Sequence, residues 1–174
     1  SRSDIKLGNE VYRRPPWAIY RNMNSWVYLG IMGENNDHFY KLSIFDLDHN
    51  RGTIFMLPEL AELTGMNSLT TFPSDQVLLA RILADRQACI LHSSGIIING
   101  QGLLFVGHSE AGKSTMMKLL RNYGEILCDD RNIIRRYPQG YRLFGTWSGG
   151  ELPDASAASA PLRGIFFLEK ADTN

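Results

Sequence analysis

The stretch Leu103-Leu-Phe-Val-Gly-His-Ser-Glu-Ala-Gly-Lys-Ser-Thr115 decides how this chain is expected to fold. Its first four residues are all apolar, as in a strand that is covered on both faces. A glycine-rich turn follows, and then a helical stretch that Gly124 ends. Residues 107–114 fit the pattern G-x-x-x-x-G-K-[ST] between a strand and a helix, which is the context in which this pattern binds phosphate. The stretch therefore predicts a phosphate-binding loop.

The spacing within this loop has a chemical reason. Glycines let the backbone curl so that successive N–H groups point at phosphate oxygens, and the helix that starts near Lys113 adds the positive end of its dipole. Lys113 supplies a charge to the β and γ phosphates, and the Ser114 hydroxyl is a ligand for Mg²⁺. The sequence therefore predicts that ATP and Mg²⁺ bind here. The expected nucleotide-binding residues are Gly107, His108, Ser109, Glu110, Ala111, Gly112, Lys113, Ser114 and Thr115.

An acidic pair, Asp129-Asp130, ends the strand that follows the expected helix. The helix from Lys113 to Tyr123 descends about 16 Å at 1.5 Å per residue. The strand from Glu125 to Asp129 climbs back about 16 Å at 3.3 Å per residue. The carboxylates should therefore return to the level of the phosphates, where one could hold Mg²⁺ and the other could accept a proton. The alternative is an ordinary turn, because Asp is common in turns.

Composition limits the partners that the chain can have. The 174 residues carry 18 Lys and Arg against 18 Asp and Glu, so the formal net charge is zero. This balance predicts no broad basic surface for nucleic acid or for an anionic membrane. The sequence contains no run of about 18 apolar residues, so no membrane span is expected. Cys89 and Cys128 lie in apolar runs without metal-type spacing, so we expect two buried, reduced thiols in a cytoplasmic protein.

The rest of the chain has a strand-rich front and a mixed body. Aromatic and β-branched runs between polar turns predict a small antiparallel sheet of about four strands within residues 11–57. The expected strands are residues 17–20, 26–31, 39–45 and 53–57. Helices are expected at residues 58–65 and 73–86, strands at 96–98, 103–106 and 125–128, a hairpin around Pro138, a loop at 147–162 and a core strand at 162–170.

These motifs resemble the HPr serine kinase/phosphorylase family and its shorter bacterial relatives, the PqqD-associated and lasso-peptide kinases. His92 stands fifteen residues before Gly107, as the family's His does, and the Asp pair follows Lys113 at the family's spacing. The stretches 91–107 and 159–170 are especially similar to the shorter relatives. The resemblance covers about residues 75–170.

The resemblance implies a role for each matching residue. Asp129 would take the proton from a substrate serine, His92 would orient or tune it, and Lys113 would hold the ATP phosphates. Ser114 and Asp130 would serve Mg²⁺, although which Asp does which stays open. A core histidine is the alternative for His92. The family would also imply a homo-oligomer.

The chain departs from the family after the Asp pair. The family's glycine-rich signature with a Glu and an Arg is replaced by Gly145-Thr-Trp-Ser-Gly-Gly-Glu151. Glu151 is a candidate second carboxylate for Mg²⁺ and equally an ordinary loop residue. HPr as the substrate, and phosphorylase activity, are therefore not carried over.

The expected fold class is α/β, an HPr kinase/PEP carboxykinase-like P-loop core with a small N-terminal antiparallel β appendage. Residues 1–65 would form the β-rich subdomain, and residues 66–174 a P-loop kinase-like domain truncated at its C-terminus. The expected function is ATP-dependent phosphoryl transfer to a Ser or Thr hydroxyl of a protein or peptide. Transfer to a small molecule, and an ATP-binding adaptor or sensor without transfer, are the alternatives. The sequence does not name the substrate.

Overall fold

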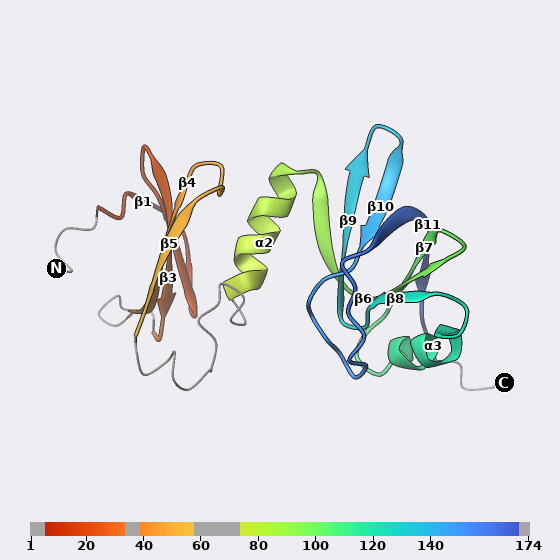
Figure 1. Ribbon diagram of the computed structural model, residues 1–174. Coiled ribbons are helices and arrows are strands. Elements are labelled where there is room, and N and C mark those ends of the chain that lie inside the picture. The colour runs from red at the N-terminus through yellow and green to blue at the C-terminus, as the bar shows by residue number, and fades with distance from the viewer. Residues whose placement is uncertain (1–5, 34–38, 58–73, 171–174) are drawn as a thin grey trace. The chain divides into compact units, whose positions relative to one another are not determined.

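The computed structural model describes residues 6–33, 39–57 and 74–170, and the chain divides into two compact units, Ser1–Leu78 and Leu79–Asn174 (Figure 1). The expected domain boundary between residues 65 and 66 lies outside the described residues, as does the helix expected at 58–65.

The first unit contains a five-stranded antiparallel sheet in which each strand pairs with the next along the chain. One face buries Ala18, Val27 and Leu29, and the other buries Trp26 and Phe45. The four expected strands are present, but the first strand was not expected because its residues are mostly exposed and lack apolar alternation. The strands are β1 (Asn9–Arg14), β2 (Trp17–Arg21), β3 (Ser25–Ile31), β4 (Phe39–Asp46) and β5 (Gly52–Met56).

Helix α2 (Ser74–Asp85) spans the division between the units, where a helix was expected. The second unit then contains one further helix in its described residues, α3 (Lys113–Leu120), and a six-stranded sheet. Its strands are β6 (Ala88–Ile98), β7 (Gln101–Val106), β8 (Glu125–Cys128), β9 (Arg131–Tyr137), β10 (Gly140–Phe144) and β11 (Ser159–Phe167).

The sheet of the second unit closes on itself. Residues 95–97 of β6 pair with β7 and also with β8, so these two strands lie on opposite edges of β6. Strand β9 continues from β8 along the first half of β6, and β10, β11 and β7 complete the ring. Strands β6 and β11 thus each take part in two layers of the sheet, as corner strands do in orthogonal packings.

The two faces of this sheet are buried by different partners. Helix α3 covers one face, where Met117 packs with Ile96 and Phe105. The opposite face lies inside the ring, where Leu104 and Leu143 pack together. Both faces of β7 are therefore covered, one by a helix and the other by strands.

The expected α/β fold class is wrong. The structure is mostly β, with 53% strand and 11% helix. An α/β core needs helices on both faces of a mostly parallel sheet, whereas here β7 and β11 form the one parallel pair between the described strands and one face of β7 is covered by strands. The apolar run of residues 103–106 fits either arrangement, which is why the pattern misled. Neither helix in the described part of the chain has the length and apolar character needed to cross a bilayer.

Candidate functional site

The glycine-rich loop of residues 107–112 joins β7 to α3. A Cβ at Gly107 would lie 2.7 Å from the Cβ of Ala111, so only glycine allows this close turn. Glu110 and Gly112 have φ angles of 68° and 103°, which turn the chain in the left-handed sense. No side chain caps the N-terminus of α3, and its first turn carries no acidic residue. The N–H groups of that turn have no intrahelical partner, so this end of α3 is suited to an anion.

Lys113 folds back over this loop. Its ammonium group donates to the carbonyl oxygens of Gly107 and His108, each at 2.9 Å, and the residue is 7% exposed. An ammonium group has three hydrogens, and these two bonds use two of them. Around it, Ser114 is half-buried, whereas the other polar residues of the loop are exposed: His108, Ser109, Glu110 and Thr115.

The sheet register brings the loop and the acidic pair to one level. Ser93 of β6 pairs with Val106, the residue before the loop, on one edge. On its other edge, the Ser93 N–H donates to the carbonyl oxygen of Asp130 at 2.9 Å. Val106 and Asp130 are therefore separated by two strand spacings, which is about 10 Å. Buried Asn132 holds this level together, because its amide donates to the carbonyl oxygens of Ser93 and Cys128.

Asp129 is buried, with 4% of its surface exposed. The Ser94 hydroxyl donates to one carboxylate oxygen at 2.7 Å, and the Leu152 N–H donates to the other at 3.3 Å. No Lys, Arg or His side chain of the described residues forms an ion pair with Asp129. The carboxylate is thus held by neutral donors in a place where a buried charge normally has a counter-charge or a metal.

Asp130 is more accessible and has different neighbours. His92 Nδ1 lies 3.2 Å from Asp130 Oδ1, and Arg131 Nε lies 3.5 Å from Oδ2. The Ser148 hydroxyl donates to Oδ2 at 2.5 Å. The structure therefore brings His92 together with Asp130, whereas the sequence interpretation had His92 act on Asp129.

A loop of residues 145–158 runs over the acidic pair and is fixed by Cys128. The Cys128 thiol donates to the Ser148 carbonyl oxygen at 2.6 Å and accepts the N–H groups of Asp130 and Arg131 at 3.4 and 3.3 Å. The Thr146 hydroxyl donates to the Arg131 carbonyl oxygen at 2.6 Å. The loop is therefore anchored directly beside the Asp130 carboxylate.

Sequence reasoning missed three residues of this site: Ser94, Cys128 and Ser148. Ser94 could have been found only from the pairing of β6 with the strand that carries the Asp pair. Both cysteines were interpreted as ordinary buried thiols, which is wrong for Cys89, because it is exposed; Cys128 is buried. Nothing in the sequence marks Ser148. Glu151, the candidate second carboxylate, is exposed and lies 3.5 Å from Lys118.

The two carboxylates differ in how well they fit Mg²⁺. In the described ranges, no three His, Cys, Asp or Glu side chains gather as a metal-binding group. Mg²⁺ does not require such a group, because it keeps several waters and binds through one or two carboxylates together with substrate phosphates. Asp129 is a buried carboxylate with no basic partner among the described residues, so it fits a cation better than Asp130, which has Arg131 beside it.

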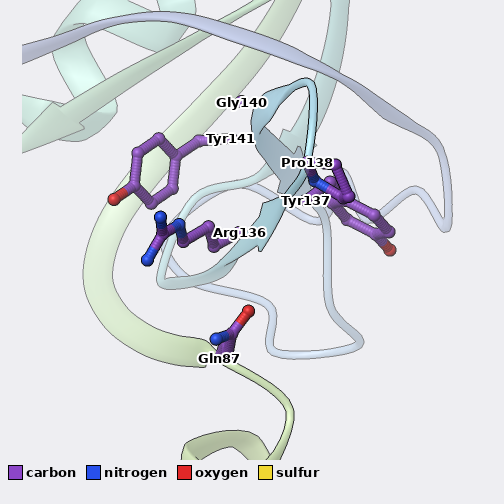
Figure 2. A pocket seen from close by; sticks show the side chains of 6 residues that line it. All are labelled: Gln87, Arg136, Tyr137, Pro138, Gly140 and Tyr141. Atoms are coloured by element: carbon purple, nitrogen blue, oxygen red, sulfur yellow. The ribbon is translucent and has the colours of Figure 1, made fainter.

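Two described pockets lie elsewhere. One, of about 670 Å³, is at the tip of the β9–β10 hairpin, and Figure 2 shows the side chains that line it: Gln87, Arg136, Tyr137, Pro138, Gly140 and Tyr141. The other, of about 560 Å³, lies beside β1 in the first unit. Neither is lined by a residue of the expected site.

No protein-family model matches this sequence, and no curated protein matches it.

The bond between Ser94 and Asp129 should contribute measurably to stability. We expect Ser94→Ala to lower the free energy of unfolding by about 1–3 kcal/mol, because it leaves a buried carboxylate oxygen without its donor. Urea unfolding measures the change. Ser156→Ala is the matched control, since Ser156 donates to Glu125 Oε1 at 2.5 Å in an exposed position, and we expect a loss of about 0.5 kcal/mol or less. Equal losses in the two variants would contradict this account of Asp129.

Proposed function

We propose that the chain transfers the γ-phosphoryl group of ATP to a Ser or Thr hydroxyl of a protein or peptide. One observation carries the proposal: Ser93 has the strand that leads into the glycine-rich loop on one side and Asp130 on the other. A phosphate-binding loop and a carboxylate–imidazole pair are the two parts that such a transfer needs, and here the backbone before the loop and that of Asp130 are two strand spacings, about 10 Å, apart.

The loop and α3 would hold the phosphates. The uncapped N-terminus of α3 directs backbone N–H groups and the positive end of the dipole at an anion, and Lys113 is already bent over the loop. This local arrangement can hold a highly charged ligand although the chain has no net charge.

Asp130 is the better candidate for the group that accepts the proton. A general base must come within hydrogen-bond reach of the substrate hydroxyl. Asp130 is partly exposed and lies against His92, whereas Asp129 is buried and both of its oxygens already accept protein hydrogen bonds. We therefore assign the proton to Asp130, oriented by His92, and exchange the roles that the sequence interpretation gave to the two carboxylates.

Mg²⁺ would be held by Asp129, through its free lone pairs or through water, and by the Ser114 hydroxyl. When bound, this ion neutralises charge that develops between the β and γ phosphates. The resemblance of the motifs to serine kinases, and the Ser148 hydroxyl seated on Asp130, both favour a hydroxyl acceptor on a polypeptide over a small molecule. A cytoplasmic location completes the proposal, because ATP is available there and the free thiols of Cys89 and Cys128 stay reduced.

Nucleotide binding should depend on Lys113. We expect Lys113→Ala to weaken ATP binding by about 10- to 100-fold, because a charge-assisted hydrogen bond is worth about 1.5–3 kcal/mol. Titration calorimetry with ATP and Mg²⁺ measures the change. The control is Lys118→Ala on the same helix, whose ammonium group is exposed and lies near Glu151. An unchanged affinity in the Lys113 variant would remove the loop from the proposal.

Transfer should depend on Asp130 separately from binding. We expect Asp130→Asn to lower the rate of transfer about 100-fold or more while ATP still binds, because a positioned base contributes about 10²- to 10⁴-fold. The assay follows label from γ-labelled ATP onto proteins in a lysate of the source organism. Label that persists in the Asp130 variant would contradict the assignment of the base. ATP binding by the unmodified protein without any transfer would instead support an adaptor or sensor.

A further inference from the structure

We propose that Ser148 occupies the acceptor position of this site and is itself phosphorylated from ATP. The inference rests on the proposed function and names the first acceptor of that site. The Ser148 hydroxyl donates to Asp130 Oδ2 at 2.5 Å, which is shorter than the contacts that His92 and Arg131 make with this carboxylate. His92 lies at 3.2 Å and Arg131 at 3.5 Å. A hydroxyl that donates to the base is the arrangement a kinase needs of its substrate.

The position of Ser148 is fixed by its backbone. Its N–H donates to the Thr146 hydroxyl at 3.2 Å, and its carbonyl oxygen accepts the Cys128 thiol at 2.6 Å. The residue is half-buried between Trp147 and Gly149, which are both exposed. The hydroxyl is therefore held in one direction while its surroundings stay open to a ligand.

A second serine of the same loop shows what a purely structural serine–carboxylate hydrogen bond looks like in this protein. Ser156 also donates to a carboxylate at 2.5 Å, that of Glu125. Glu125 begins β8, whereas Asp130, the residue that Ser148 contacts, lies five residues further along, about 16 Å for an extended chain. Ser156 therefore makes the same kind of hydrogen bond, but to a carboxylate that lies away from the level of the phosphate loop. The imidazole of His92 and the guanidinium group of Arg131 lie beside Asp130 instead.

Arg131 gives the acceptor position a further property. One of its guanidinium nitrogens lies 3.5 Å from the Ser148 oxygen. Guanidinium groups bind phosphoryl oxygens with strong, directional hydrogen bonds. A phosphoryl group that arrives at Ser148 would therefore meet a cation at once.

The step balances with ATP as the donor. The Ser148 oxygen attacks the γ-phosphorus, and an O–P bond forms while the bond from that phosphorus to the β–γ bridging oxygen breaks. The bridging oxygen leaves with the electron pair as part of ADP, and the hydroxyl proton passes to Asp130. The product puts about two negative charges beside the Asp130 carboxylate, which repels them. The loop should then move away from Asp130 and free the acceptor position for another hydroxyl.

The test uses the purified 174-residue chain with ATP and Mg²⁺. Intact-mass measurement detects the addition of one phosphoryl group, and peptide mass spectrometry locates it. We expect the group on Ser148, absent from Ser148→Ala and from Asp130→Asn, and retained in Ser156→Ala. Because the unmodified chain alone reveals the modified residue, a variant that fails to fold does not decide the outcome.

The other results separate the two claims. ATP hydrolysis, or transfer to another protein, without a phosphoryl group on Ser148 would overturn this inference and leave the proposed function standing. Phosphorylation at Ser156 or elsewhere but not at Ser148 would overturn it equally. Failure to bind ATP would overturn both claims.

Discussion

The pairing of β6 with one continuous antiparallel partner is the constraint on which the second unit depends. Gly95 pairs with Cys128 and His92 with Arg131, so the register is the same directly on either side of the Asp pair, and it shifts only further back, between Gly95 and Ile96. The two aspartates interrupt the regular strand without shifting it. This is possible because the Ser93 N–H still finds the Asp130 carbonyl oxygen, and Asn132 bridges the backbone on both sides. These hydrogen bonds satisfy backbone groups that the interruption between β8 and β9 would otherwise leave unpaired in the interior.

The same constraint gives the two carboxylates different surroundings. Asp129 and Asp130 lie between β8 and β9, where the Asp129 side chain is buried and that of Asp130 is partly exposed. Asp129 meets a hydroxyl and a backbone amide in the interior, and Asp130 meets an imidazole, a guanidinium group and a serine at the surface. Two adjacent residues between β8 and β9 therefore carry carboxylates of different chemistry, and the loop over them contacts Asp129 through the Leu152 N–H and Asp130 through the Ser148 hydroxyl.

The sequence predicted local elements better than their assembly. The strand before the loop, α3 and the strand after it follow from Leu103-Leu-Phe-Val, Lys113 and Gly124, because these signals are local. The closure of the sheet does not follow, since it depends on β6 and β11 each pairing with different strands along their two halves. The grouping of His92 with Asp130 required that register, and Ser148 reaches the site through a loop without a regular pattern.

The central claim is that the glycine-rich loop holds ATP phosphates beside the His92–Asp130 pair. A crystal structure of the chain with Mg²⁺ and a non-hydrolysable ATP analogue tests it most directly. The account predicts the β and γ phosphates against Lys113 and the first turn of α3, with the γ-phosphate facing Asp130 and the Ser148 hydroxyl. An analogue bound elsewhere, for instance in the hairpin pocket of Figure 2, with the loop empty, would contradict it.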